Sequence, residues 1–315
     1  MRLPRRPPIR RTPCLPAGRL AMTNNNMINL KPVHIREEII KATRAFFYER
    51  KFHEVIVPVL NDVVPLESHL FPFQTSWNTV HGEKKCYLSL SLERSLKRML
   101  AAGIGNCFAL GKSFRNLENS GSQHLPEFLM LEWYREDADY NQIMKDTEEL
   151  VLFIQKKTRL PPFDRLRVNF LAMTSPWKKA SLYSLFKKTG GWDESREVFD
   201  QIFVNKIESK FPKEPFFLID FPTRFSPLCK AQKEKPHLAE RFELYINGME
   251  IGNGNTENTD ADSVRKVLKK PVDEVFLKAL DDMNGKSHAG MGIGIDRLAM
   301  LFSGVMDIKE VEILV

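Results

Sequence analysis

The sequence GKSFRNLENSGSQHLPEFLMLEWY, residues 111–134, reads as a strand, a short polar loop and a returning strand. Glycine, serine and asparagine interrupt the chain at residues 119–122, and β-forming residues flank them. The first strand carries a lone arginine, Arg115, and the apolar run Phe128–Tyr134 holds one acid, Glu132, among residues that otherwise read as core. Removing an unpaired charge from water is costly, so both side chains should have an interaction partner. A guanidinium on a rigid strand can bind a phosphate through two hydrogen bonds, and the hairpin therefore predicts a phosphate site.

This hairpin resembles motif 2 of the class II aminoacyl-tRNA synthetases, in the form found in lysyl-tRNA synthetases and their single-domain relatives. Those relatives are the ligases that attach lysine or β-lysine to a lysine side chain of elongation factor P. The family pattern F-R-N-E, a loop, and H-N-P-E-F-x-M-L-E-W/F-Y corresponds to residues 114–116 and 124–134. The resemblance implies an α+β fold, an antiparallel sheet flanked by helices. It also implies that Arg115, Glu118, His124 and Phe128 bind ATP and that Glu132 and Tyr134 bind lysine.

The charge of the chain is unevenly distributed. Of 315 residues, 28% are charged and 43% hydrophobic, as in ordinary soluble globular proteins, and the net charge is +7. Residues 1–30 contain six arginines and no acid, which leaves 41 basic against 40 acidic residues in the rest. This nearly neutral body gives no support for a large nucleic-acid footprint, although a local basic patch stays open.

The first 30 residues, rich in arginine and proline, resemble a disordered basic tail ahead of one catalytic domain at 31–315. A transit peptide and an over-extended gene start, with Met22 or Met27 as the true beginning, are the alternatives. The four cysteines form no C-x-x-C pair, so we expect a reducing cytoplasm and no structural zinc. No apolar run approaches the ~20 residues of a membrane-spanning helix.

Residues 34–51 carry apolar side chains at helical spacing and lead into a β-branched strand at 54–57, which Pro58 closes. Helix, strand and proline resemble motif 1 of the same family. In that family motif 1 builds the dimer interface, so the resemblance implies a homodimer through residues 34–58.

Glu93 lies where a strand at 86–92 passes into a helix at 92–101. The family has S-P-E or A-P-E at this point, and there the glutamate contacts an amino group of the substrate. A carboxylate favoured by the dipole at a helix start is the alternative, and both roles can hold. A helix is expected at 141–157, and residues 158–215 correspond to a variable insertion for which no function is predicted.

Glu243 and Glu250 lie on two β-like runs joined by Asn247-Gly248, a strong hairpin signal. Two carboxylates brought together across a hairpin repel unless a cation lies between them. Magnesium held by one or two carboxylates and substrate phosphates meets this need, and the resemblance implies the same two ligands. Two solvent-facing strand acids are the alternative.

Two glycine-rich stretches follow. Gly252-Asn253-Gly254 permits a close approach of the backbone to a ligand, and the resemblance implies that Asn253 and Glu257 contact lysine. Residues 289–297, AGMGIGIDR, resemble motif 3, G-x-G-x-G-x-D-R, followed by an apolar helix at 298–302. Its arginine, Arg297, is expected to stack on a purine and reach a phosphate of ATP.

The sequence departs from the family pattern in and near the site. Leu117 stands where motif 2 has glutamate, and Glu118 follows it in a loop that is one residue longer. Residues 119–123 contain no basic residue, although the family carries one there to help neutralise the γ-phosphate. Leu125 replaces an asparagine, and Asn255 replaces the aromatic residue of G-N-G-F. Gly252 is typical of lysyl-tRNA synthetases and favours α-lysine over β-lysine.

The resemblance implies that the lysine carboxylate attacks the α-phosphate of ATP, giving an aminoacyl adenylate and pyrophosphate, with Arg115 and Arg297 as the catalytic arginines. Positioning and charge neutralisation drive such chemistry. Lysyl-tRNA synthetases carry an anticodon-binding barrel ahead of the catalytic domain, and here motif 1 begins near residue 34, so we expect elongation factor P as the acceptor. A tRNA ligase without its anticodon domain, a maker of free lysyl adenylate, and a non-catalytic protein that binds lysine or ATP are the alternatives.

Overall fold

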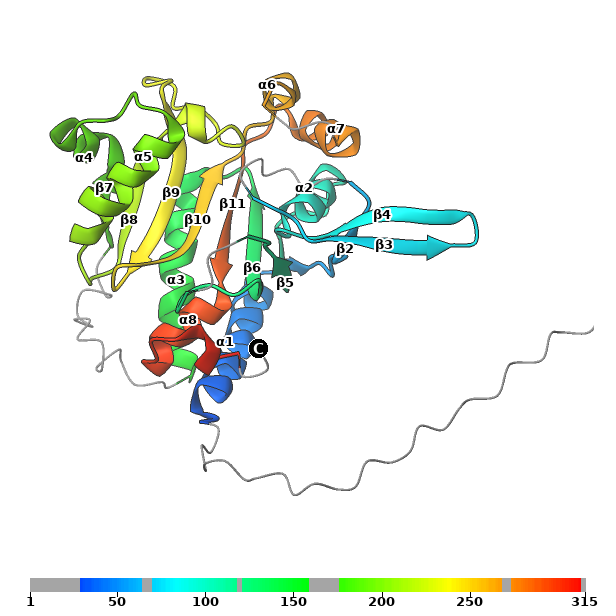
Figure 1. The fold of residues 1–315 in the computed structure, drawn as a ribbon, viewed down its shortest axis with the longest axis horizontal. Helices are drawn as coiled ribbons and strands as arrows, with labels where there is room; N and C mark the ends of the chain where they lie inside the picture. The colour runs from blue at the N-terminus through cyan, green and yellow to red at the C-terminus, as the bar shows by residue number, and fades with distance from the viewer. Residues whose placement is uncertain (1–28, 64–69, 118–120, 159–175, 268–272, 313–315) are drawn as a thin grey trace, which may run out of the picture.

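A computed structural model describes residues 29–63, 70–117, 121–158, 176–267 and 273–312. Within these ranges an eight-stranded sheet forms the centre of the molecule (Figure 1). Its order is β1 (His53–Glu54), β5 (Cys107–Phe114), β6 (Glu127–Glu136), β11 (His288–Gly294), β10 (Met249–Thr256), β9 (Leu238–Ile246), β8 (Phe216–Pro222) and β7 (Lys178–Ser181).

The sheet is antiparallel at its centre and parallel at both edges. The strands from β5 to β8 pair antiparallel, whereas β1 pairs parallel with β5 and β7 parallel with β8. A parallel pair needs a long crossover. Helices α4 (Leu182–Thr189) and α5 (Arg196–Ile202) supply it between β7 and β8. The predicted antiparallel sheet is thus confirmed for the centre, and the α+β class is confirmed.

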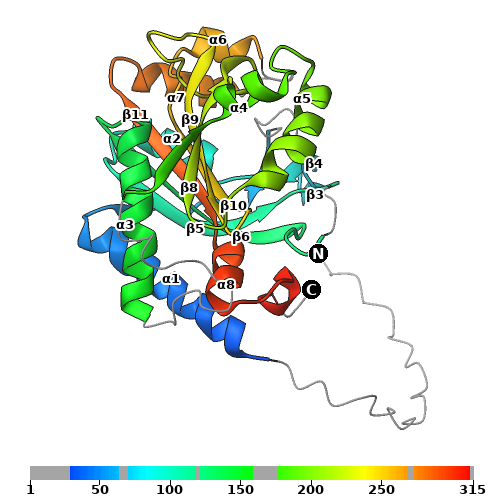
Figure 2. The ribbon, with the colours of Figure 1, turned by 90° about the vertical axis from the view of Figure 1, so that its left-hand side faces the viewer.

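Three helices cover one face of the sheet: α1 (Lys31–Glu49), α3 (Tyr140–Thr158) and α8 (Ile295–Ser303) (Figure 2). The helical spacing read in residues 34–51 is confirmed, because Ile35, Ile39 and Phe46 are buried against this face. The strands contribute every second residue to the same core, among them Trp133 and Phe242.

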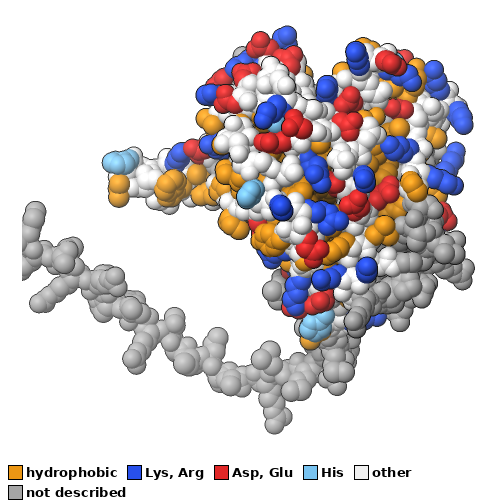
Figure 3. All heavy atoms as spheres, turned by 180° about the vertical axis from the view of Figure 1, so that it is seen from behind, with side chains coloured by type: hydrophobic (Ala, Val, Ile, Leu, Met, Phe, Trp, Pro, Cys, Tyr) orange, Lys and Arg blue, Asp and Glu red, His pale blue; other side chains and the backbone are white. Residues whose placement is uncertain are grey.

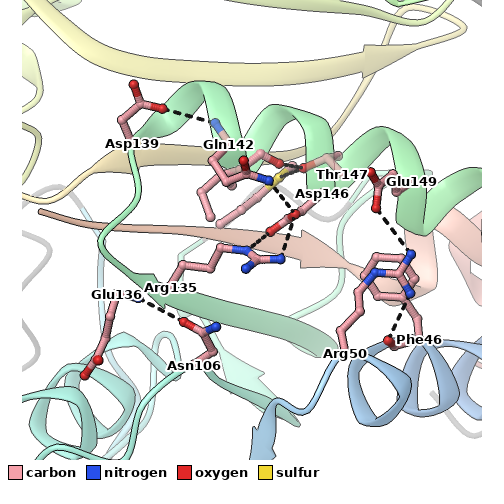
Figure 4. Close-up of polar contacts among 12 residues, drawn as sticks. Phe46, Arg50, Asn106, Arg135, Glu136, Asp139, Gln142, Asp146, Thr147 and Glu149 are labelled. Atoms are coloured by element: carbon pink, nitrogen blue, oxygen red, sulfur yellow. Dashed lines mark hydrogen bonds and ion pairs between the residues drawn. The ribbon is translucent and has the colours of Figure 1, made fainter.

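Polar contacts fasten this helix layer to the sheet (Figure 4). Arg135 on β6 donates to the buried carboxylate of Asp146 on α3, with Nη2 3.0 Å from Oδ1. Gln142 donates to the same oxygen at 3.1 Å. Arg50, just after α1, donates to Glu149 on α3 at 3.2 Å. Each buried charge on this face therefore has an opposite charge beside it, as burial requires.

On the opposite face the described helices and a second, small sheet lie toward the edges of the central sheet (Figure 1). Near β5 lie α2 (Glu93–Ala101), α6 (Ala261–Arg265), α7 (Glu274–Met283) and a small sheet of β2 (Leu60–Asn61), β4 (Gly82–Leu88) and β3 (Gln74–Thr79). Near β8 lie α4 and α5. Short helical turns occupy Phe203–Ile207, Glu208–Lys210, Thr223–Phe225 and Ile308–Glu310.

Several local predictions can be compared with the structure. Asn247 and Gly248 have φ of 54° and 72°, so the predicted tight hairpin turn is confirmed. The strand expected at 54–57 is shorter in the structure, where β1 ends at Glu54. Its last hydrogen bond to β5 is the one that the N–H of Val55 donates to Phe108. Pro58, three residues later, has no N–H to donate. The described part of the segment from 158 to 215 extends the sheet through β7.

Some predictions fall outside the described residues, namely the tail up to residue 28, Glu118 and residues 159–175. In the part of the chain that is described, no helix is both long and apolar enough to cross a membrane.

Candidate active site

Two rows of paired residues run across four strands on the face away from the helices. The first row is Glu132, Gly292, Asn253 and Glu243, and the second is Tyr134, Gly290, Asn255 and Arg241. Directly paired residues project to the same face of a sheet, and successive residues alternate between faces. The residues in between, such as Trp133 and Phe242, accordingly enter the helix-side core. Strand register alone thus brings together acids from β6 and β9, an arginine from β9 and two amides from β10.

A cavity of about 540 Å³ lies over these two rows. Among the described residues, four arginines and four glutamates line it: Arg115, Arg196, Arg224, Arg241, Glu93, Glu132, Glu243 and Glu250. Tyr134, Asn253 and Asn255 also face it, as do Gly290 and Gly292. The cavity therefore combines groups for anions with groups for cations, as a site for a nucleotide beside an amine requires.

Of the predicted site residues, seven line this cavity: Glu93, Arg115, Glu132, Tyr134, Glu243, Glu250 and Asn253. Phe128 lies next to it, because its ring centroid is 5.1 Å from the guanidinium carbon of Arg115. His124, Arg297 and Glu257 are not on the cavity wall. His124 and Arg297 lie behind Glu250, and Glu257 lies beneath α2.

Arg297 joins three parts of the chain at the start of α8. Its guanidinium donates to the carbonyl of Glu250 at 2.8 Å and to that of Gln123 at 3.2 Å, and contacts Nε2 of His124 at 2.7 Å. Its Nη1 is also 3.9 Å from a carboxylate oxygen of Glu250. Arg297 thereby ties the motif 2 hairpin to the β9–β10 hairpin, a positioning contact that the sequence did not indicate.

Asp296, the residue before it, is a structural anchor. Its carboxylate is 1% exposed, accepts from the backbone N–H of Leu129 on β6 at 2.7 Å, and lies 2.6 Å from Arg36 of α1. It connects α1, β6 and α8, the elements that carry motifs 1, 2 and 3. An acid in the first turn of an apolar helix is the sequence signal that could have indicated it.

Glu243 and Glu250 both line one end of the cavity, where their carboxylates repel each other. Glu243 accepts from Arg241 at 2.8 Å and from the Tyr245 hydroxyl at 3.1 Å. Burial, and after it the charge of Glu250, raises the pKa of Glu243 from 4.5 to about 7. Two such carboxylates open to a cavity fit a magnesium ion that also binds phosphate oxygens. A β-bulge between Glu250 and Gly252 lets both Glu250 and Asn253 face this side.

The other end of the cavity is built around α2. Glu132 accepts from the backbone N–H of Leu92, which precedes the helix, at 2.7 Å. Lys97 on α2 pairs with Glu93 one turn earlier and with Glu257 at 2.5 Å, and the exposure of Lys97 is 1%. Burial alone would lower the pKa of Lys97, but the charges of Glu257 and Glu93 outweigh it and raise that pKa. Burial raises the pKa of Glu257, against the pull of Lys97.

The glycines of β10 and β11 have a different role from the expected one. A Cβ on Gly252 would lie 2.0 Å from the carbonyl oxygen of Gly292, and one on Gly254 would meet Phe242 at 2.7 Å. The prediction that Gly252 and Gly254 let the backbone approach a ligand was therefore wrong, since both point away from the cavity and allow close packing within the protein. Gly290 makes room for the Tyr134 ring, and Gly292 faces the cavity.

Three arginines on the cavity wall were missed from the sequence. Arg241 alternates with Glu243 on β9, and that period of two could have indicated it. Arg196 and Arg224 both contact the Phe225 ring, with guanidinium carbons 5.1 and 4.4 Å from its centroid. Arg196 comes from the segment for which no function was predicted, and no sequence signal marks it.

A larger cavity, about 770 Å³, lies beside β7 and β8 and is lined by residues of 176–189 and 206–216. None of the described residues that line it belongs to the predicted site. Glu214 is the one acid among them, so this cavity lacks the opposed charges that gather over the two rows.

Comparison with known proteins agrees with this geometry. Residues 18–314 match the family model of class II tRNA synthetases (D, K and N). A lysine–tRNA ligase of Saccharolobus solfataricus is 32% identical over 328 residues, covering 89% of this chain and 63% of the relative. Those of Nostoc punctiforme and Pasteurella multocida are 32% and 30% identical, with 88% of this chain and 55% and 62% of the relatives covered.

The chain thus spans a little over half the length of these relatives, and the matched part contains all three motifs and both rows of the cavity floor. The chain belongs to the class II tRNA synthetase family of the D, K and N type.

Proposed function

We propose that the protein activates lysine with ATP, forming lysyl adenylate and pyrophosphate. The observation that carries this proposal is the opposition of charges in one cavity, with Glu93 and Glu132 at the α2 end and Glu243, Glu250 and Arg241 at the β9 end. A substrate with amino groups and a polyphosphate can satisfy both ends at once. The names of the matched relatives, lysine–tRNA ligases, support the same amino acid.

In this mechanism the protein positions the reactants and stabilises charge, and no side-chain nucleophile is needed. Arg115 binds the α-phosphate and the lysine carboxylate, with the Phe128 ring holding its guanidinium in place. Glu93, Glu132, Tyr134 and Asn253 bind the lysine. Arg297 stabilises Glu250 and, through Gln123 and His124, the motif 2 hairpin.

Glu243 and Glu250 would hold a magnesium ion, which supplies charge neutralisation to the phosphate oxygens when bound. Arg196 and Arg224 offer positive charge at the cavity wall, although the described part of the motif 2 loop contains no basic residue. We assign them to the pyrophosphate leaving group or to an anionic acceptor.

For the acceptor we propose a lysine side chain of elongation factor P. The near balance of 41 basic and 40 acidic residues outside the tail supports a protein acceptor. Figure 3 shows both signs of charge interspersed over the back of the molecule, on the side of α3. The alternative acceptor is tRNA, which the names of the relatives favour.

We also propose a homodimer through α1 and the strand after it, in a reducing cytoplasm. Large apolar side chains are exposed next to this segment: Tyr48, Ile56, Val59, Leu60 and Phe71. An apolar surface of this kind fits a second copy of the chain. Gel filtration with light scattering tests it, and a monomer at micromolar concentration would contradict it.

The decisive assay is lysine- and magnesium-dependent exchange of pyrophosphate into ATP. Exchange that requires lysine supports activation, and its absence in a folded protein that binds lysine or ATP leaves a non-catalytic binder. Transfer of labelled lysine to purified elongation factor P, measured beside transfer to tRNA, then separates the two acceptors.

A further inference from the structure

Lys97 is a fully buried ammonium whose partners are two carboxylates. It lies on α2 with a side-chain exposure of 1%, pairs with Glu93 one helical turn earlier, and reaches Glu257 beyond β10 at 2.5 Å. The rings of Tyr134 and Phe276 lie 5.9 and 5.7 Å from its Nζ. A lysine is almost never buried this completely unless it is paired, and here both partners are carboxylates.

The three members of this cluster differ in access to the cavity. Glu93 lines the cavity wall, whereas Lys97 and Glu257 do not. Glu257 has a side-chain exposure of 1% and lies two residues after Asn255, which faces the cavity. Lys97 therefore connects Glu93, which lines the cavity, to Glu257, which is buried next to it.

A second pair on the molecule provides the contrast. Glu37 and Lys41 on α1 have the same order and spacing as Glu93 and Lys97, at 2.7 Å, but their side chains are 55% and 59% exposed. A glutamate–lysine pair at this spacing stabilises a helix without being buried. The burial of Lys97 thus serves something other than the stability of α2 as a helix.

We propose that Lys97 is a positioning residue of the amine pocket, an internal ammonium that fixes Glu93 toward the cavity and sets the charge available to the substrate. This inference rests on the proposed activation of lysine. When Glu93, Glu132 and Glu257 are ionised they carry three negative charges, and Lys97 compensates one. The two that remain match the two amino groups of a basic diamino acid.

The resemblance implies that Glu257 contacts lysine, and the structure adds that Lys97 binds the carboxylate of Glu257. Glu93 and Glu132 line the cavity itself. A role of Lys97 that is only structural would fasten α2 to the sheet. Such a role predicts a loss of stability with no selective effect on lysine.

The test is pyrophosphate exchange by the full-length chain with Lys97→Met, Lys97→Ala and the control Lys278→Met, which removes an exposed lysine of an i,i+4 pair on α7. We expect Lys97→Met to raise the KM for lysine roughly tenfold or more, because charge-assisted hydrogen bonds of Glu93 are lost. The KM for ATP should change by less than about twofold, since the phosphate end is separate. Lys278→Met should match the wild type in both.

Chemical rescue separates charge from packing. Propylammonium has the atoms from Cγ to Nζ that Lys97→Ala removes, so it should lower the lysine KM of this variant toward the wild-type value. Propan-1-ol, which is neutral and of similar size, should not. Equal rescue by both compounds, or a lysine KM that is unchanged in Lys97→Met, would overturn the inference.

If the single variants do not fold, Lys97→Met with Glu257→Gln removes one positive and one negative buried charge together, a change that proteins often tolerate. This double variant should fold and still show the raised lysine KM, and a normal KM would overturn the inference. If the wild type itself shows no pyrophosphate exchange, the proposed function is contradicted, whatever the outcome for Lys97. Thermal shift by lysine, present in the wild type and lost in the double variant, would then still support the inference, and its absence in the wild type would overturn both.

Discussion

The two faces of the central sheet are made by alternate residues of the same strands, yet charged side chains are arranged differently on them. On β6, Trp133 is completely buried in the helix-side core, while its neighbours Glu132 and Tyr134 face the cavity. Charge on the helix side is matched pair by pair, as with Arg135 and Asp146. On the cavity side like charges converge, as with Glu243 and Glu250. The difference shows that the fold brings like charges together over the cavity, where a ligand can relieve their repulsion.

The largest effect should come from the helix side. Trp133→Ala should lower the free energy of unfolding by about 3–5 kcal/mol, because it removes an indole that packs against Phe47 and leaves a cavity. Urea unfolding followed by circular dichroism measures it. A loss below about 1 kcal/mol would mean that this face is not the one that holds the fold together.

Glu132, the residue before Trp133, should show the opposite pattern, a loss of activity without a loss of stability. Glu132→Gln keeps the oxygen that accepts from Leu92 N–H and removes the charge. We expect lysine-dependent exchange to fall by roughly a hundredfold, since a hydrogen bond to a charged group is lost, while the fold is retained. Circular dichroism and the lysine KM are measured together. Wild-type exchange by a folded Glu132→Gln would remove Glu132 from the amine pocket.

Two glycines one strand apart sharpen the contrast. Gly252→Ala would place a methyl 2.0 Å from the carbonyl of Gly292 and should destabilise the fold by about 1–3 kcal/mol. Gly292→Ala would meet Glu132 at 3.4 Å, an ordinary contact, but would intrude on the cavity floor. It should leave the melting temperature close to that of the wild type and raise the KM for lysine. Equal melting temperatures for both variants would contradict the assignment of the two faces.

The smallest effect concerns pH. Because the pKa of Glu243 is raised to about 7, the folded protein retains a proton between about pH 4.5 and 7 that the unfolded chain releases, so stability falls as pH rises through this range. A cation between Glu243 and Glu250 needs both ionised. With ATP present, magnesium should therefore raise the melting temperature more at pH 8 than at pH 6, by roughly 2 °C or more.

Glu243→Gln is the control, and it should abolish this difference between the two pH values. If the effect of magnesium on the melting temperature of the wild type did not depend on pH, Glu243 would not be a ligand of the metal.

Much of the architecture was predictable from local pattern. The motif 2 hairpin, the Asn247-Gly248 turn, the helices near residues 34–51 and 141–157, and the acids and arginine of the cavity follow from periodicity, turn residues and the resemblance. The predictions that were wrong concerned contacts across strands. Gly252 packs on Gly292, and its partner is set by strand register, which no run of adjacent residues encodes.

The sequence by itself determined the family, the order of strands and helices, and which residues carry charge, because these depend on neighbours along the chain and on short patterns. Only the tertiary structure decided that Glu132, Gly292, Asn253 and Glu243 form one row, that Arg196 reaches the cavity, and that Lys97 holds Glu257. These relations join residues from 10 to 160 positions apart. They depend on register and on the burial of charge, which are properties of the packed sheet as a whole.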